Sequence, residues 1–115
     1  MGYRHQVTIA VYDKDYENIK NLCSARLFAL AQVYESEEIK VFNWNWVKWN
    51  EDTFSSVPKI ENYISQTDAF FIRIGEDITD CEQIGYGNDD KLKKTIFLTR
   101  FTDIEGKLIK DSKTQ

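Results

Sequence analysis

The sequence predicts a single α+β domain with a small mixed or antiparallel sheet of three to four strands and two main helices packed on one face. Short segments with alternating apolar residues recur along the chain, as in strands with one buried face. Between them lie segments whose apolar residues are three or four positions apart, the spacing of a helix with one apolar face. The chain has 115 residues, of which 42% are hydrophobic, enough for one domain with its own core.

The N-terminal half predicts a strand, a long helix and a second strand. Residues 6–12 (QVTIAVY) alternate and are rich in β-branched side chains, which favours a strand. An apolar stripe then predicts a helix from about 16 to about 33, and residues 39–46 predict the next strand. Because a helix separates these strands, we expect them to form a parallel pair with a right-handed connection. One face of the second strand carries large aromatic side chains: Phe42, Trp44 and Trp46.

The C-terminal half predicts a short helix over 57–66, beginning near Pro58, and a third strand over 69–74. The pattern of 79–85 (TDCEQIG) resembles a capping box followed by a terminating glycine, which predicts one or two helical turns. Residues 95–101 predict the last strand, and 104–115 a frayed polar tail. The resulting order is β-α-β-α-β-(short α)-β, which is close to a ferredoxin-like βαββαβ layout.

All three tryptophans lie between residues 44 and 49. We predict that Trp44 packs in the core, because it shares a strand face with other aromatic residues. We predict that Trp49, at the start of a polar stretch, is the tryptophan most exposed to a partner, since tryptophan is favoured at binding hot spots. Stacking of single-stranded bases on these rings would need a basic groove, for which the neighbouring sequence offers only Lys40 and Lys48.

Residues 76–90 form an acidic segment without Lys or Arg, in a chain whose net charge is −4. Three interpretations are open: a solvated loop and helix cap, a surface that binds a basic site on another protein, or a calcium or magnesium site. The EF-hand spacing is absent, and we expect no metal site. The overall acidity argues against a plain nucleic-acid binder. The carboxylates of this segment are Glu76, Asp77, Asp80, Glu82, Asp89 and Asp90.

Catalysis finds little support in the sequence, and we predict a non-enzyme without a cofactor. No nucleotide-binding glycine motif, zinc-protease motif or nucleophile elbow is present. His5, the only histidine, precedes the first strand and is expected to be exposed, whereas Cys23 lies on the apolar stripe of the long helix and is expected in the core. Carboxylates near Cys81 are expected to raise its pKa. The two cysteines form no disulfide framework, and a cytoplasmic location is the simplest interpretation.

Three segments resemble parts of small, mostly uncharacterised phage-encoded accessory proteins: WNWVKWN (44–50), IENYI (60–64) and FFIRIGEDITD (70–80). In those proteins an aromatic-rich strand, a short helix and a strand ending in a similar motif occur in this order. Phage proteins of this size with a known role are often inhibitors of host defence, of the anti-CRISPR or anti-restriction type. The resemblance implies no catalytic residues.

The main hypothesis is therefore a small cytoplasmic inhibitor that binds a host nuclease or another nucleic-acid-processing defence complex. Its contact surface would combine Trp49 with the acidic residues of 76–90, whose carboxylates would compete with phosphate for Arg and Lys on the target. One alternative is an assembly module that forms a homodimer through an aromatic sheet face. A third hypothesis is a single-stranded nucleic-acid binder that uses the tryptophans as stacking platforms.

Overall fold

The computed structural model describes residues 4–36, 38–77, 79–85 and 107–111. Within these residues the chain forms six strands and three helices. In chain order they are β1 (His5–Tyr12), α1 (Asp13–Leu22), α2 (Ala25–Ala29), β2 (Gln32–Ser36), β3 (Ile39–Val47), α3 (Ser56–Ser65), β4 (Phe70–Gly75), β5 (Cys81–Gly85) and β6 (Lys107–Lys110).

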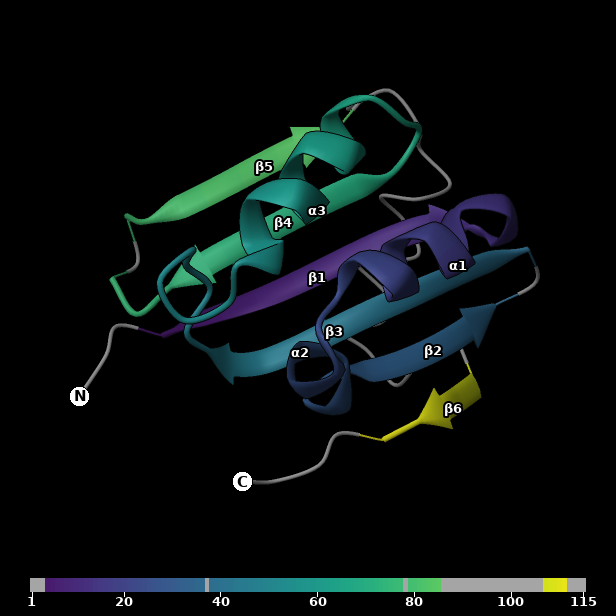
Figure 1. The fold of residues 1–115 in the computed structure, drawn as a ribbon, viewed down its shortest axis with the longest axis horizontal. Coiled ribbons are helices and arrows are strands. Elements are labelled where there is room, and N and C mark those ends of the chain that lie inside the picture. The colour runs from purple at the N-terminus through teal and green to yellow at the C-terminus, as the bar shows by residue number, and fades with distance from the viewer. Residues whose placement is uncertain (1–3, 37, 78, 86–106, 112–115) are drawn as a thin grey trace.

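The strands form one sheet in the order β5-β4-β1-β3-β2-β6, and every neighbouring pair is antiparallel. All three helices lie on the same face of this sheet (Figure 1). The predicted α+β class is thus confirmed, with an antiparallel sheet. The predicted count of three to four strands is too low, because the described sheet has six.

The centre of the sheet explains how the chain connects its strands. The order β4-β1-β3-β2, with α1 and α2 between β1 and β2 and with α3 between β3 and β4, is a βαββαβ arrangement of the ferredoxin-like kind. The expected parallel pairing of 6–12 with 39–46 is wrong, because β1 and β3 are antiparallel. The helical connection instead leads from β1 to β2, a strand that was not expected from the sequence.

The main core lies between the helices and the sheet. Alternate residues of β1 (Val7, Ile9 and Val11) face it, together with Ile60 and Ile64 of α3. A second buried cluster on the opposite sheet face was not expected. It consists of apolar residues at the other set of alternating strand positions. Its members are Ala10, Tyr34, Ile39, Val41 and Phe70.

The predicted long helix over 16–33 is two short helices followed by a strand. The helical path stops at Cys23, whose backbone is extended, and Ser24 begins α2 by accepting a hydrogen bond from the Leu27 N–H at 3.2 Å. Serine is a preferred N-cap, so the break has a local cause. The last residues of the apolar stripe then belong to β2, where Val33 pairs with Phe42 of β3.

Three predicted features of the C-terminal half have different outcomes. The helical turns expected at 79–85 are wrong, because Cys81–Gly85 forms β5 against β4. The predicted strand 95–101 lies outside the described residues. Within the tail expected to fray, Lys107–Lys110 forms β6 at the edge beside β2. No helix in the described part of the chain is long and apolar enough to cross a membrane.

Candidate functional site

The candidate site begins at an irregularity near the end of β3. Val7 of β1 lies opposite Trp44, whereas His5 lies opposite Val47, so β3 holds one more residue than β1 over this interval. Such a bulge shifts the alternation of the strand by one position. At the bulge Trp46 has a φ of 64°, in the left-handed region, which costs a residue other than glycine roughly 1–2 kcal/mol.

The bulge decides which aromatic side chains enter the core. Trp44 is buried as predicted, and its Nε1–H donates to the Leu27 carbonyl at 2.9 Å. After the extra residue, Val47 and Trp49 occupy the core-facing positions, while the Trp46 side chain is 63% exposed. Trp44 and Trp46 therefore do not share a surface, so the aromatic sheet face expected for a homodimer is not present as predicted.

The prediction that Trp49 is the exposed tryptophan is wrong. Trp49 is only 2% exposed and lies with its ring centroid 5.2 Å from that of Trp44 and 6.0 Å from that of Phe71. Its Nε1–H donates to Glu61 Oε2 at 3.0 Å, which satisfies the indole in the core. The alternation that begins again at Val47 carries this ring inward, and Trp46 takes the exposed position in its place.

Arg4 connects the backbone of Trp46 to the turn after β4. Its guanidinium Nη1 donates to the Trp46 carbonyl at 3.5 Å, and its backbone N–H donates to Glu76 Oε1 at 3.0 Å. Beside the bulge, the Gln6 amide donates to Asn45 Oδ1 at 3.2 Å. Arg4 thus links the backbone of the bulge to the carboxylate of Glu76.

The described acidic residues do not form one continuous exposed surface. Glu76 and Asp77 are exposed, and Asp77 Oδ1 accepts hydrogen bonds from the Thr79 N–H at 2.9 Å and its hydroxyl at 2.8 Å. These bonds lower the pKa of Asp77, so it remains ionised at neutral pH. Asp80 instead lies 3.4 Å from Arg73 and 3.5 Å from His5. The Glu82 side chain, Asp89 and Asp90 lie outside what the structure describes.

His5 is buried, contrary to the prediction that it is exposed. His5 is the first residue of β1, and its Nε2 lies 3.5 Å from Asp80 Oδ2. The side chain is therefore packed against the turn that follows β4. Burial lowers the pKa of His5, and the charge of Arg73 acts in the same direction. Asp80 and Glu76 oppose this change without reversing it. His5 is therefore neutral at pH 7.

Cys23 packs against the main core, as predicted. Burial raises the pKa of its thiol to about 12, which keeps it protonated and weakly nucleophilic at neutral pH. The side chain of Cys81 lies outside the described part of the structure. In that described part, no group of three or more His, Cys, Asp and Glu residues is placed to hold a metal ion.

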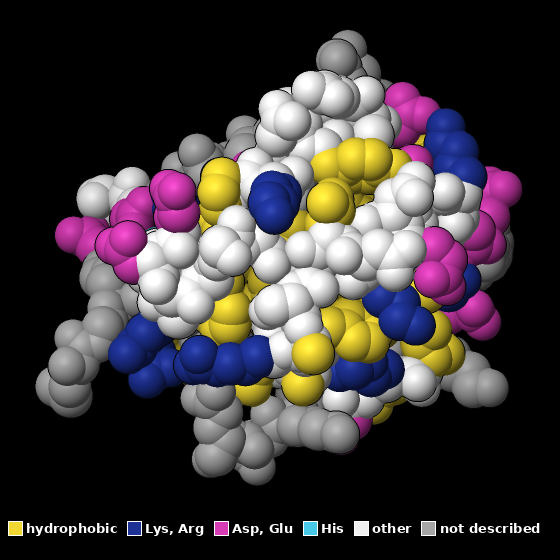
Figure 2. Space-filling view, in the orientation of Figure 1, with side chains coloured by type: hydrophobic (Ala, Val, Ile, Leu, Met, Phe, Trp, Pro, Cys, Tyr) yellow, Lys and Arg dark blue, Asp and Glu magenta, His cyan; other side chains and the backbone are white. Residues whose placement is uncertain are grey.

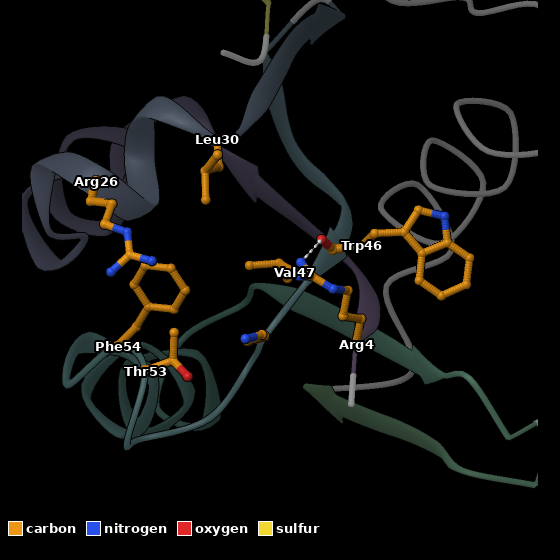
Figure 3. A pocket seen from close by; sticks show the side chains of 8 residues that line it. Arg4, Arg26, Leu30, Trp46, Val47, Thr53 and Phe54 are labelled. Atoms are coloured by element: carbon orange, nitrogen blue, oxygen red, sulfur yellow. Dashed lines mark hydrogen bonds between the residues drawn. The ribbon is translucent and has the colours of Figure 1, made fainter. Parts of the chain in front are cut away.

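A pocket of about 420 Å³ lies beside the bulge, on the side away from the Trp46 ring. Figure 3 shows Arg26 and Phe54 on one side of it and Arg4 on the other, while the indole of Trp46 points outward. Lys and Arg side chains gather over α2 and the end of β3 (Figure 2). The pocket is lined by Arg4, Arg26, Leu30, Trp46, Val47, Lys48, Thr53 and Phe54.

Lys48 is apparent from the sequence beside the tryptophans, whereas the part played by Arg4 and Arg26 is not. These two residues are far from Lys48 in the chain, and only the antiparallel pairing of β1 with β3 and the break before α2 bring them together. The only local signal was the aromatic spacing itself. Trp44, Trp46, Val47 and Trp49 cannot all lie on one face of a regular strand. Comparison of the chain with family models, with curated proteins and with solved structures finds no match.

Proposed function

We propose that this protein is a non-catalytic binding protein that contacts a partner protein through Trp46. The observation that carries the proposal is the 63% exposure of this large ring on a residue whose backbone has a φ of 64°. Both features disfavour tryptophan here: the ring leaves most of its apolar area in water, and the backbone conformation favours Gly or Asn. Unfavourable local geometry of this kind is concentrated at functional sites.

The chemistry around Trp46 suits a partner with a charged surface. A rigid aromatic side chain can form the desolvated centre of a contact, with charged residues at its rim. Arg4 and Glu76 provide both signs of charge near the bulge, and the exposed Asp77 follows Glu76 in the chain. The carboxylates of Glu76 and Asp77 would pair with Arg or Lys of the partner. Trp49 and Asp80, which are engaged inside the molecule, are not part of the proposed surface.

The partner that we propose is a nucleic-acid-processing protein of a host defence complex, which this chain would inhibit in the host cytoplasm. Two considerations support this class. The resemblance of residues 44–50, 60–64 and 70–80 to phage accessory proteins favours a host target. Exposed carboxylates next to an aromatic anchor are suited to a site that normally binds phosphate.

The test is affinity capture from host lysate with the wild-type chain and two variants. Trp46→Asn removes the ring and retains a residue that tolerates the left-handed backbone. Leu108→Asn is the matched control, because Leu108 is a large apolar side chain that is 42% exposed on β6. We expect Trp46→Asn to lose the captured nuclease or defence protein and Leu108→Asn to retain it. Equal capture by all three proteins would contradict the proposal.

A further inference from the structure

The pocket beside the bulge collects positive charge from three separate segments. Arg4 precedes β1, Arg26 lies in α2, and Lys48 follows β3, and all three line a volume of about 420 Å³. None of the lining residues is acidic. A cavity of this size falls within the ordinary range for small-molecule sites.

The charged side-chain groups of these three residues form no ion pair with a carboxylate in the described part of the structure. The ion pairs recorded there involve Lys14, Lys40, Arg73 and His5, but none of the pocket cations. Three like charges around one cavity repel each other, and an anion in the cavity would relieve that repulsion. The charge pattern is notable in a chain whose net charge is −4.

The rest of the lining provides an apolar wall and a hydroxyl group. Leu30, Val47 and Phe54 supply the apolar part, and Thr53 supplies the hydroxyl. The Arg26 guanidinium lies over the Phe54 ring, with 5.1 Å between its central carbon and the ring centroid. Stacking uses the face of the guanidinium and leaves its N–H edge available for a planar or tetrahedral anion.

We infer that this pocket binds a phosphate monoester attached to an apolar or aromatic group, as in a nucleoside 5′-monophosphate. A single carboxylate carries one negative charge and is matched by one arginine, whereas a phosphate monoester carries about −1.5 to −2 at neutral pH and has three acceptor oxygens. The apolar wall then accommodates the attached group. The site goes beyond the proposed protein contact: the two lie next to each other and share Arg4, but the Trp46 ring points away from the pocket.

The test is a calorimetric titration of the full chain with a nucleoside 5′-monophosphate, the unphosphorylated nucleoside and inorganic phosphate. We expect saturable binding of the monophosphate, weaker binding of inorganic phosphate and no binding of the nucleoside. Arg26→Gln and Lys48→Gln should each weaken the affinity about ten-fold or more, as for loss of a charge-assisted hydrogen bond. Lys59→Gln is the matched control, because Lys59 is exposed on α3 and does not line the pocket.

A 5′-phosphorylated single-stranded oligonucleotide and its unphosphorylated form distinguish the two sources of such a phosphate. Tighter binding of the phosphorylated strand than of the mononucleotide would identify a strand end, and equal binding a free nucleotide. The inference is overturned if the monophosphate does not bind, if the nucleoside binds equally well, or if Lys59→Gln weakens binding as much as the pocket variants. Asp77→Asn alters the proposed protein contact at a residue that does not line the pocket, so it should retain the affinity for the monophosphate. A failure here is therefore separable from a failure of the proposed protein contact.

Discussion

Trp46 and Trp49 are three positions apart and have opposite environments. Trp49 is 2% exposed with its indole N–H bonded to Glu61, and Trp46 is 63% exposed on a left-handed backbone. The identity of the residue does not explain the difference. One additional residue in β3 explains it, because a strand places successive side chains on opposite faces and a one-residue shift exchanges them.

Replacement of Trp49 by Ala should destabilise the protein by about 3–5 kcal/mol, as for other large truncations in a core. The variant would leave a cavity beside Trp44 and Phe71 and remove the partner of the Glu61 carboxylate. Urea denaturation followed by circular dichroism measures this loss. A loss below about 1 kcal/mol would place Trp49 at the surface, as the sequence had predicted.

The stability of the protein should fall as the pH is lowered from 7.5 to 5. The folded state holds His5 with a lowered pKa, whereas the unfolded state takes up a proton near pH 6.5. Below that pH the unfolded state binds more protons than the folded state, so the free energy of unfolding decreases until the folded pKa is passed. The groups that face His5 are Arg73, Asp80 and Glu76.

Urea denaturation at several pH values tests this expectation, with His5→Gln as the control. His5 is the only histidine of the chain, so the difference between the two pH profiles isolates its contribution. The wild type should lose more stability than the variant over this window. A wild-type profile that is flat, or that rises toward pH 5, would show that protonated His5 is accommodated in the folded state.

At the scale of elements, segments with one clear periodicity were predictable. Residues 6–12, 39–46 and 69–74 alternate and correspond to β1, β3 and β4, and 57–66 corresponds to α3. The stripe over 16–33 misled because its spacing continues past Ser24, where a local cap ends one helix and begins another. Residues 79–85 have a local capping pattern, but pairing with the free edge of β4 outweighs a weak local preference.

The candidate site was less predictable than the fold. Burial of Trp44, Val47 and Trp49 on one face requires a break in alternation, but the sequence does not say whether that break occurs or which residue it displaces. Arg4, Arg26 and Lys48 meet only through long-range pairing. Asp80 was expected at the surface because neighbouring residues are acidic, and its pairing with Arg73 and His5 depends on the β4-β5 turn.

At the scale of the whole molecule, the α+β sandwich confines its unfavourable features to one end of the sheet. The exposed indole, the left-handed residue and the pocket with three cations lie together at the bulge, while the core under the helices is continuous. In natural proteins, locally unfavourable geometry of this kind is often retained at functional sites, at a cost in stability. Our central claim is that Trp46 contributes to binding rather than to the stability of the fold.

The measurement that tests this claim most directly is the free energy of unfolding of Trp46→Gly and Trp46→Ala beside the wild type. In a regular strand a protein with Gly is less stable than one with Ala by about 0.5–1 kcal/mol. At a left-handed position the order reverses, because Gly has no Cβ atom to clash with the backbone. We predict that Trp46→Gly is more stable than Trp46→Ala by about 1 kcal/mol and close to the wild type. If both variants lose more than about 2 kcal/mol, the Trp46 side chain supports the fold and the claim is contradicted. If the Ala variant is the more stable, position 46 is not left-handed and the unfavourable geometry on which the claim rests is absent.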